Sequence, residues 1–203
     1  MSQAALVGGR TTLVDQFVTR SIATDAALVV AGAGLTALAA QVVVPLWPVP
    51  ITGQTLAVLL VGSALGAARG ALSMVLYAVV GVIGVPVFAE ATSGTGALFG
   101  ASGGYIVGFI FSAALVGWIA ERAGDRRFLG ATLAFAAGTV VTFAIGMIWL
   151  AAVLGTTLAE TLEFGLYPFI IGGIVKSLLA AAIIPTIWRS VGRRRTRDSN
   201  TAT

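Results

Sequence analysis

Four apolar stretches, each long enough to cross a lipid bilayer, constrain this chain more than any other feature. A helix needs about 20 consecutive apolar residues to span the hydrocarbon core. Charged residues make up only 10% of the chain, against about 25% in a soluble domain, and the mean hydropathy is +1.00. The sequence therefore predicts an all-α membrane protein that crosses the bilayer several times. The four stretches are 24–44, 103–121, 128–151 and 168–188.

A further apolar segment, residues 56–85, is too long for one straight span and short for two. Arg69 lies near its middle, beside Gly66 and Gly70. Positive residues favour the cytoplasmic side of a membrane. If the segment crosses once, the arginines at 122–127 face outside. If it crosses twice and turns at Arg69, every arginine is cytoplasmic. We therefore predict six transmembrane helices, with short helices 2 and 3 and both termini in the cytoplasm.

These spans divide the chain into three parts. We predict a cytoplasmic N-terminal segment at 1–22, a transmembrane substrate-binding domain at 23–190, and a basic cytoplasmic tail without regular structure at 191–203. The connections 45–54, 86–102 and 152–167 contain no Lys or Arg, so we place them outside. Irregular backbone at membrane depth usually lines a cavity. The first two of these loops therefore predict an outward-facing pocket that they cover.

The composition excludes several classes of function. The chain has no histidine and no cysteine, so it lacks the usual general bases, thiol nucleophiles and zinc ligands. We therefore expect no enzyme activity, no metal site and no cofactor. The net charge is +4, but the arginines lie where a membrane protein carries them. We accordingly expect a lipid bilayer around this protein and no nucleic-acid partner.

Lys176, the only lysine of the chain, lies in the apolar sequence FIIGGIVKSLLAAAIIP. The six-helix topology places it in the outer half of the last helix. One interpretation is that its ammonium group extends to the lipid headgroups. The other is that it faces the bundle interior and pairs with an anion, since ionisable residues inside membrane segments are usually functional. That anion is either a ligand carboxylate or one of Glu90, Glu160 and Glu163.

Three segments carry a resemblance to a known family. They are PVPITGQTL at 48–56, GSALGAARGALSMVLYAVVGVIGVPVF at 62–88 and GASGGYIVGF at 100–109. In this order and spacing they resemble the BioY family, the biotin-binding S components of energy-coupling factor (ECF) transporters. The resemblance covers residues 24–190. Two positions depart from the family pattern: Gly173 replaces a common acidic residue, and Ala101 replaces the proline of a GPxGG motif.

The resemblance implies a prokaryotic cell-membrane protein that captures biotin for an ATP-driven importer. It implies a membrane coupling subunit, which docks on Ala27 and Ala31, and a pair of cytoplasmic ATPases. It also implies that Lys176 meets the valerate carboxylate of biotin. A different small vitamin, or a ligand-gated channel or small transporter, remains an alternative. The predicted ligand-binding residues are Lys176, Gln54, Thr52, Phe88, Thr92, Tyr105 and Gly104.

Overall fold

The computed structural model describes residues 12–122 and 125–201, and most of them are helical. The longer helices are α1 (Ile22–Ala40), α2 (Gln54–Leu65), α3 (Ala67–Val82), α5 (Gly103–Ala120), α6 (Phe128–Leu154) and α8 (Ile170–Thr201). The shorter helices are α4 (Thr95–Phe99) and α7 (Leu158–Gly165), with single 3₁₀ turns at η2 (Val14–Gln16), η3 (Ala89–Ala91) and η4 (Tyr167–Phe169). Strands β1 (Val43–Val44) and β2 (Ile51–Thr52) pair antiparallel.

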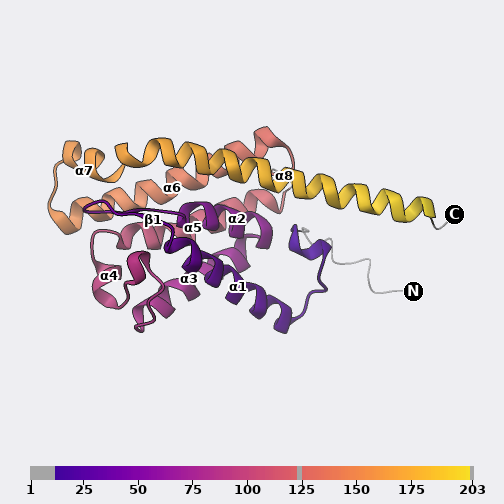
Figure 1. Ribbon diagram of the computed structural model, residues 1–203, viewed down its shortest axis with the longest axis horizontal. Coiled ribbons are helices and arrows are strands. Elements are labelled where there is room, and N and C mark those ends of the chain that lie inside the picture. The colour runs from indigo at the N-terminus through magenta and orange to yellow at the C-terminus, as the bar shows by residue number, and fades with distance from the viewer. Residues whose placement is uncertain (1–11, 123–124, 202–203) are drawn as a thin grey trace.

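The longer helices run back and forth along one axis, so the molecule has two distinct ends (Figure 1). The β1–β2 ribbon, α4 and α7 lie at one end, which we call the loop end. The start of α1 and the far end of α8 lie at the other, which we call the termini end. Because the helices alternate in direction, the described arginines at positions 20, 69, 122, 126, 127 and 189 all belong to the termini end. Arg10 lies outside the described residues.

Four helical segments are long and apolar enough to cross a membrane, and they match the four predicted spans. Helices α2 and α3 are shorter, at 12 and 16 residues, or about 18 and 24 Å at 1.5 Å per residue. Helix α2 packs against α1, α3, α5, α6 and α8, and most of its side chains are buried. Surrounding protein therefore shields this short helix from lipid, which a helix that stops inside a bilayer requires. That α2 and α3 each cross the membrane remains a prediction.

The turn between α2 and α3 falls at Gly66 rather than at Arg69, where we predicted it. Gly66 has a φ of 88°, which disfavours any residue with a Cβ atom. The two helices then fold back on each other in close contact: a Cβ atom on Gly70 would lie 3.0 Å from the Cα of Gly62. The small residues at four-residue spacing thus allow close helix approach, and the chain reverses before it reaches Arg69.

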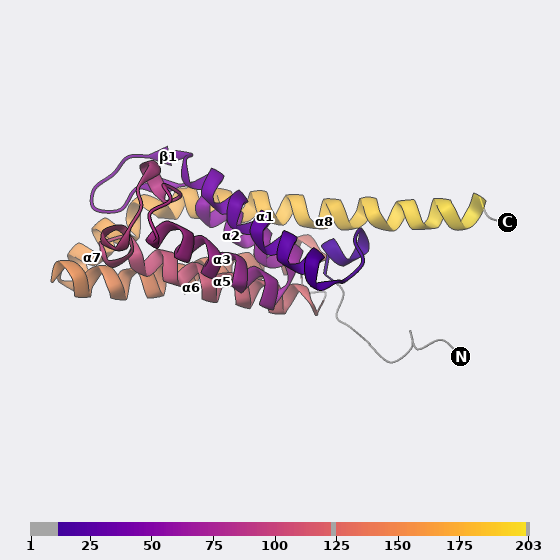
Figure 2. The same ribbon diagram turned by 90° about the horizontal axis from the view of Figure 1, so that it is seen from below.

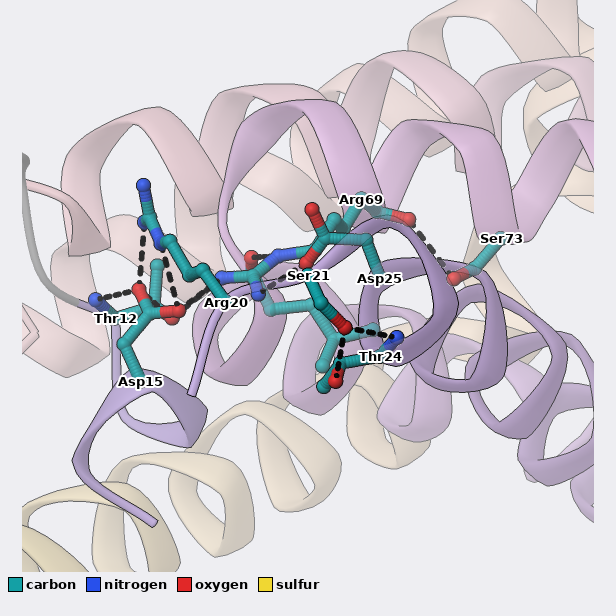
Figure 3. A network of polar contacts seen from close by, with 9 residues as sticks. Thr12, Asp15, Arg20, Ser21, Thr24, Asp25, Arg69 and Ser73 are labelled. Atoms are coloured by element: carbon teal, nitrogen blue, oxygen red, sulfur yellow. Dashed lines mark hydrogen bonds and ion pairs between the residues drawn. The ribbon is translucent and has the colours of Figure 1, made fainter. Parts of the chain in front are cut away.

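Arg69 is buried at the start of α3 and binds acidic residues from far earlier in the chain (Figure 3). Its guanidinium group donates to Asp15 at 2.9 Å and to Asp25 at 3.1 Å. It also donates to the hydroxyl of Thr12 and the carbonyl of Leu65. This network fixes η2 and the start of α1 against α3. The charge count alone did not indicate that Arg69 is buried and paired.

Three local features were not predicted. Strand β2 lies in the predicted loop 45–54 and pairs with β1, which lies at the end of the predicted span 24–44, so the mostly helical fold includes one short strand pair. Loops 86–102 and 152–167 contain α4 and α7, and a capping box at Thr157 starts α7. The basic tail is not irregular, because α8 continues as a helix to Thr201. Figure 2 shows α8 extending past the other helices at the termini end. The helix continues because no glycine or proline follows Gly192 in the described part of the tail.

Candidate functional site

A cavity of about 500 Å³ opens at the loop end of the bundle. Both predicted covering loops contribute to it: the β1–β2 connection supplies residues 46–50, and the segment after α3 supplies residues 88–90, 92, 93, 96 and 97. Helices α5, α6 and α8 form the deeper walls, with Tyr105, Phe143, Gly173 and Lys176 among their lining side chains. The expectation that these two loops cover a pocket is therefore confirmed, and its lining is mixed in polarity.

Lys176 lies in the second turn of α8 and lines this cavity. Its Nζ atom donates to the carbonyl oxygen of Thr52 and, at 3.2 Å, to the hydroxyl of Thr55. Within the described residues it has no carboxylate within ion-pair distance. The side chain is therefore directed into the protein and not toward headgroups. Its charge is partnered only by neutral oxygens, which leaves it able to attract an anion.

The acidic residues proposed as internal partners do not form ion pairs with Lys176 in the described structure. Glu160 closes the capping box of α7, where its side chain accepts from the backbone and hydroxyl of Thr157. Glu90 lines the cavity but lies in the loop wall, in the left-handed region with a φ of 56°. Glu163 forms no ion pair with any of the described residues either. A ligand carboxylate is the alternative that remains open.

Thr52 and Gln54 belong to one hydrogen-bond network at the start of α2. The hydroxyl of Thr52 donates to Oε1 of Gln54 at 2.8 Å. Nε2 of Gln54 donates to the hydroxyl of Tyr77 in α3, and Gln54 is 6% exposed. Because the Thr52 carbonyl accepts from Lys176, this hydrogen-bond network joins β2, α2, α3 and α8. Sequence reasoning missed Tyr77, since nothing in its local sequence indicates a partner 23 residues away.

Aromatic rings form the apolar walls. The ring of Tyr105 meets Phe143 edge-on at 5.7 Å and stacks with Phe169 at 6.3 Å. The Tyr105 hydroxyl donates to the carbonyl of Gly165 and so holds the end of α7, while the residue lines the cavity. Phe88, which is almost fully buried, packs edge-on against Tyr77. Sequence reasoning missed Phe143 and Phe169, which lie in spans that read only as apolar.

The threonine and serine hydroxyl groups that line the cavity differ in whether they already form a hydrogen bond within the protein. Thr92 donates to the carbonyl of Ala89 within its own turn. Ser93 and Ser102 also line the cavity, and no hydrogen bond of their hydroxyls is recorded among the described residues. These two serines are therefore the neutral polar groups that a ligand meets without breaking an internal contact.

Two predicted sets of residues lie away from the cavity. Gly104 is not among its lining residues; it packs against α6, where an added Cβ atom would lie 2.1 Å from the Cβ of Trp149. The structure therefore gives Gly104 a packing role, because only a residue without a side chain fits there. Ala27 and Ala31 are exposed on one face of α1. They lie on a helix surface that the rest of the described chain leaves uncovered.

The arrangement suits an elongated ligand with one anionic group. One wall carries an ammonium group beside a threonine hydroxyl, others carry aromatic rings, and the rim carries free serine hydroxyls. Binding pockets for small molecules combine largely apolar walls with a few such polar groups. Within the described residues no cluster of acidic side chains could hold a metal ion.

Comparisons with known proteins agree on one family. The sequence model of the BioY family matches residues 10–193. A protein described as a probable biotin transporter BioY, from Pyrococcus horikoshii, is 36% identical over 161 residues, which cover 79% of this chain and 94% of that protein. The biotin transporter BioY2 of Lactococcus lactis is 32% identical over 75% of this chain and 83% of its own length.

A solved structure has the same fold. It is the crystal structure of the S-component for biotin from an ECF-type ABC transporter. The TM-score is 0.74, and the match covers 84% of this chain and 95% of that chain, with 23% sequence identity. The order and packing of the helices described above are therefore those of a solved S-component.

Proposed function

This chain belongs to the BioY family, and from that membership we propose that it is the substrate-capture (S) component of an ECF-type importer and binds biotin in the loop-end cavity. Proteins of this family are transport components rather than enzymes. Biotin is then the transported ligand, and no cofactor is needed. The cavity volume of about 500 Å³ is within the range of pockets that hold small molecules, roughly 300–1,000 Å³.

The observation that carries the proposal is Lys176, whose ammonium group faces the cavity without a carboxylate partner. A charge in such a site is costly unless an opposite charge compensates it. The valerate carboxylate of biotin supplies that charge, and the hydroxyl of Thr55, 3.2 Å from Nζ, is a second donor beside it. The thiophane ring and aliphatic tail then contact Tyr105 and Phe143, and the ureido group meets the hydroxyls of Ser93 and Ser102.

We further propose that the loop end faces the outside of a prokaryotic cell. The support is the distribution of charge, because the described arginines lie at the termini end and positive residues favour the cytoplasm. In this orientation Ala27 and Ala31 present a small-residue surface within the membrane. Small side chains let two helices approach closely in lipid. We propose that a membrane coupling subunit docks there and connects this chain to a pair of cytoplasmic ATPases.

Equilibrium binding to the purified, detergent-solubilised protein tests the proposed ligand. We expect saturable binding of labelled biotin at one site per chain, unaffected by an excess of thiamine or riboflavin. Competition by one of those vitamins would instead identify an S component for another ligand. Absence of saturable binding for all three would contradict the proposal.

A further inference from the structure

The cavity wall between α3 and α4 has a backbone that is unfavourable on its own. Ala89, Glu90, Thr92 and Ser93 of this wall line the cavity. Glu90 and Ala91 both adopt left-handed backbone conformations, with φ of 56° and 55°. Each such residue costs about 1–2 kcal/mol when it is not glycine. A loop with two of them in succession needs hydrogen bonds and packing contacts that offset this cost.

One set of these contacts comes from α3. The ring of Phe88 packs edge-on against Tyr77 at 5.4 Å. It also covers Gly81 so closely that an added Cβ atom there would lie 2.1 Å from the ring. At the far end of the loop the backbone N–H of Gly94 donates to the carbonyl of Gly81 at 2.7 Å. These contacts fix the two ends of the wall. Across its centre, the backbone N–H of Phe88 donates to the carbonyl of Thr92 and that of Thr92 donates to the carbonyl of Ala89, both at 3.1 Å and both within the loop.

From outside the loop, the centre is held by Gln41, which caps the C-terminus of α1. Its Nε2 atom donates to the carbonyl of Phe88 at 3.1 Å, and its Oε1 atom accepts from the backbone N–H of Ala91 at 3.1 Å. The same Nε2 also donates to Ala37 within α1. In the described chain, no other side chain from outside residues 88–92 hydrogen-bonds to this stretch. Gln41 itself does not line the cavity.

From this geometry we infer that Gln41 is a positioning residue for the binding site: it ties the cavity wall at 88–92 to α1 and thereby keeps the bound ligand enclosed. The inference rests on the proposed function, since the enclosed ligand is biotin. The amide bonds the carbonyl of Phe88, ahead of the left-handed pair, and the N–H of Ala91, within it. It thereby helps to fix the positions of Glu90 and Thr92 without lining the cavity. Any displacement of α1 would also be transmitted to the wall through this side chain.

Substitution of Gln41 tests the inference by the rate at which ligand leaves. We expect Gln41→Ala to weaken biotin binding by about 3- to 30-fold, mainly through faster dissociation. The variant loses two neutral hydrogen bonds to the wall, one partly buried and one exposed. The matched control is Val42→Ala, since Val42 is the next residue and its side chain is 70% exposed. Provided that the wild-type protein binds biotin, a dissociation rate that is the same in Gln41→Ala and wild type would overturn the inference.

A second variant separates positioning from general loss of structure. In Gln41→Glu, an ionised carboxylate still accepts from Ala91 but repels the carbonyl of Phe88, whereas a protonated one donates to it. The ratio of variant to wild-type affinity should therefore be low at pH 7 and rise as the pH falls toward the ordinary pKa of glutamate, about 4.3. All other charged groups, including the ligand carboxylate, are the same in both proteins, so the ratio cancels their contributions. A ratio that does not depend on pH would contradict the inference. Failure of the wild type to bind biotin would instead remove the proposed function on which it rests.

Discussion

Lys176 is the residue on which the proposed recognition of biotin most depends, and its contacts define a sharp test. A charge-assisted hydrogen bond contributes roughly 1.5–3 kcal/mol. We therefore expect Lys176→Met to weaken biotin binding by about 10- to 150-fold, because methionine keeps the apolar stem and removes the charge. Binding of biotin methyl ester, which lacks the carboxylate, should change little. Titrating both ligands into both proteins measures the difference.

The structure adds a competing role that this experiment distinguishes. Lys176 also donates to the carbonyl of Thr52, so it supports the strand that leads into α2. If that support were its whole role, the variant would lose affinity for the acid and the ester alike. Equal losses would therefore refute direct carboxylate recognition.

Asp15 predicts a dependence of stability on pH at the termini end. Burial opposes ionisation of this carboxyl, but hydrogen bonds from Arg20, Thr12 and Arg69 outweigh it and hold the pKa of Asp15 below its ordinary value of 3.8. A lowered folded-state pKa stabilises the protein above the unfolded-state value and loses that contribution as the pH falls below it. We expect Asp15→Asn to destabilise the protein by about 2 kcal/mol at pH 7.

The measurement is the thermal midpoint of wild type and Asp15→Asn in detergent, from pH 7 to pH 3. The difference between the two should be constant down to about pH 4, near the ordinary pKa of an aspartate, and shrink below it. A difference that persists unchanged at pH 3 would mean that the Asp15 charge does not stabilise the fold.

At the scale of elements, α1 has two contrasting faces. One face packs on α2 and α3. The other exposes Ala27 and Ala31, and beside them Gly34 has no atom within 4 Å of a Cβ position. Large residues on that face would prevent close helix contact in lipid without entering the cavity, which lies at the loop end.

We therefore expect the double variant Ala27→Leu and Ala31→Leu to bind biotin like the wild type and to lose co-purification with the coupling subunit. Ala136→Leu is the matched control, because Ala136 is an exposed alanine on α6. Co-purification that survives the double change would move the docking surface to another helix.

For the whole molecule, the proposed orientation can be tested by labelling, because the chain contains no cysteine of its own. Single cysteines at Thr95 and Leu158 lie at the loop end, and one at Ala68 lies at the opposite end; all three positions are exposed. We expect an impermeant thiol reagent to label the first two in intact cells and Ala68 only after the membrane is permeabilised. Labelling of Ala68 in intact cells would reject the six-span topology.

The sequence by itself determined the four long apolar helices and the end of the bundle to which the arginines belong. Span length and hydropathy are local properties, since a stretch of about 20 apolar residues can satisfy its backbone in lipid only as a helix. The same reasoning found Lys176, because a single charged residue stands out in an otherwise apolar span. It also located the two loops that cover the cavity, whose prolines and glycines interrupt helical structure.

Only the tertiary structure decided which side chains meet. Arg69 forms ion pairs with Asp15 and Asp25. Gln54 hydrogen-bonds to Tyr77, and Gln41 hydrogen-bonds to the loop at Phe88 and Ala91. Each of these pairs joins elements whose relative rotation and depth are set by close helix packing, such as the approach of Gly62 to Gly70. Local periodicity carries no information about that rotation. For the same reason Gly104, which shares a sequence motif with Tyr105, packs behind the cavity while Tyr105 lines it.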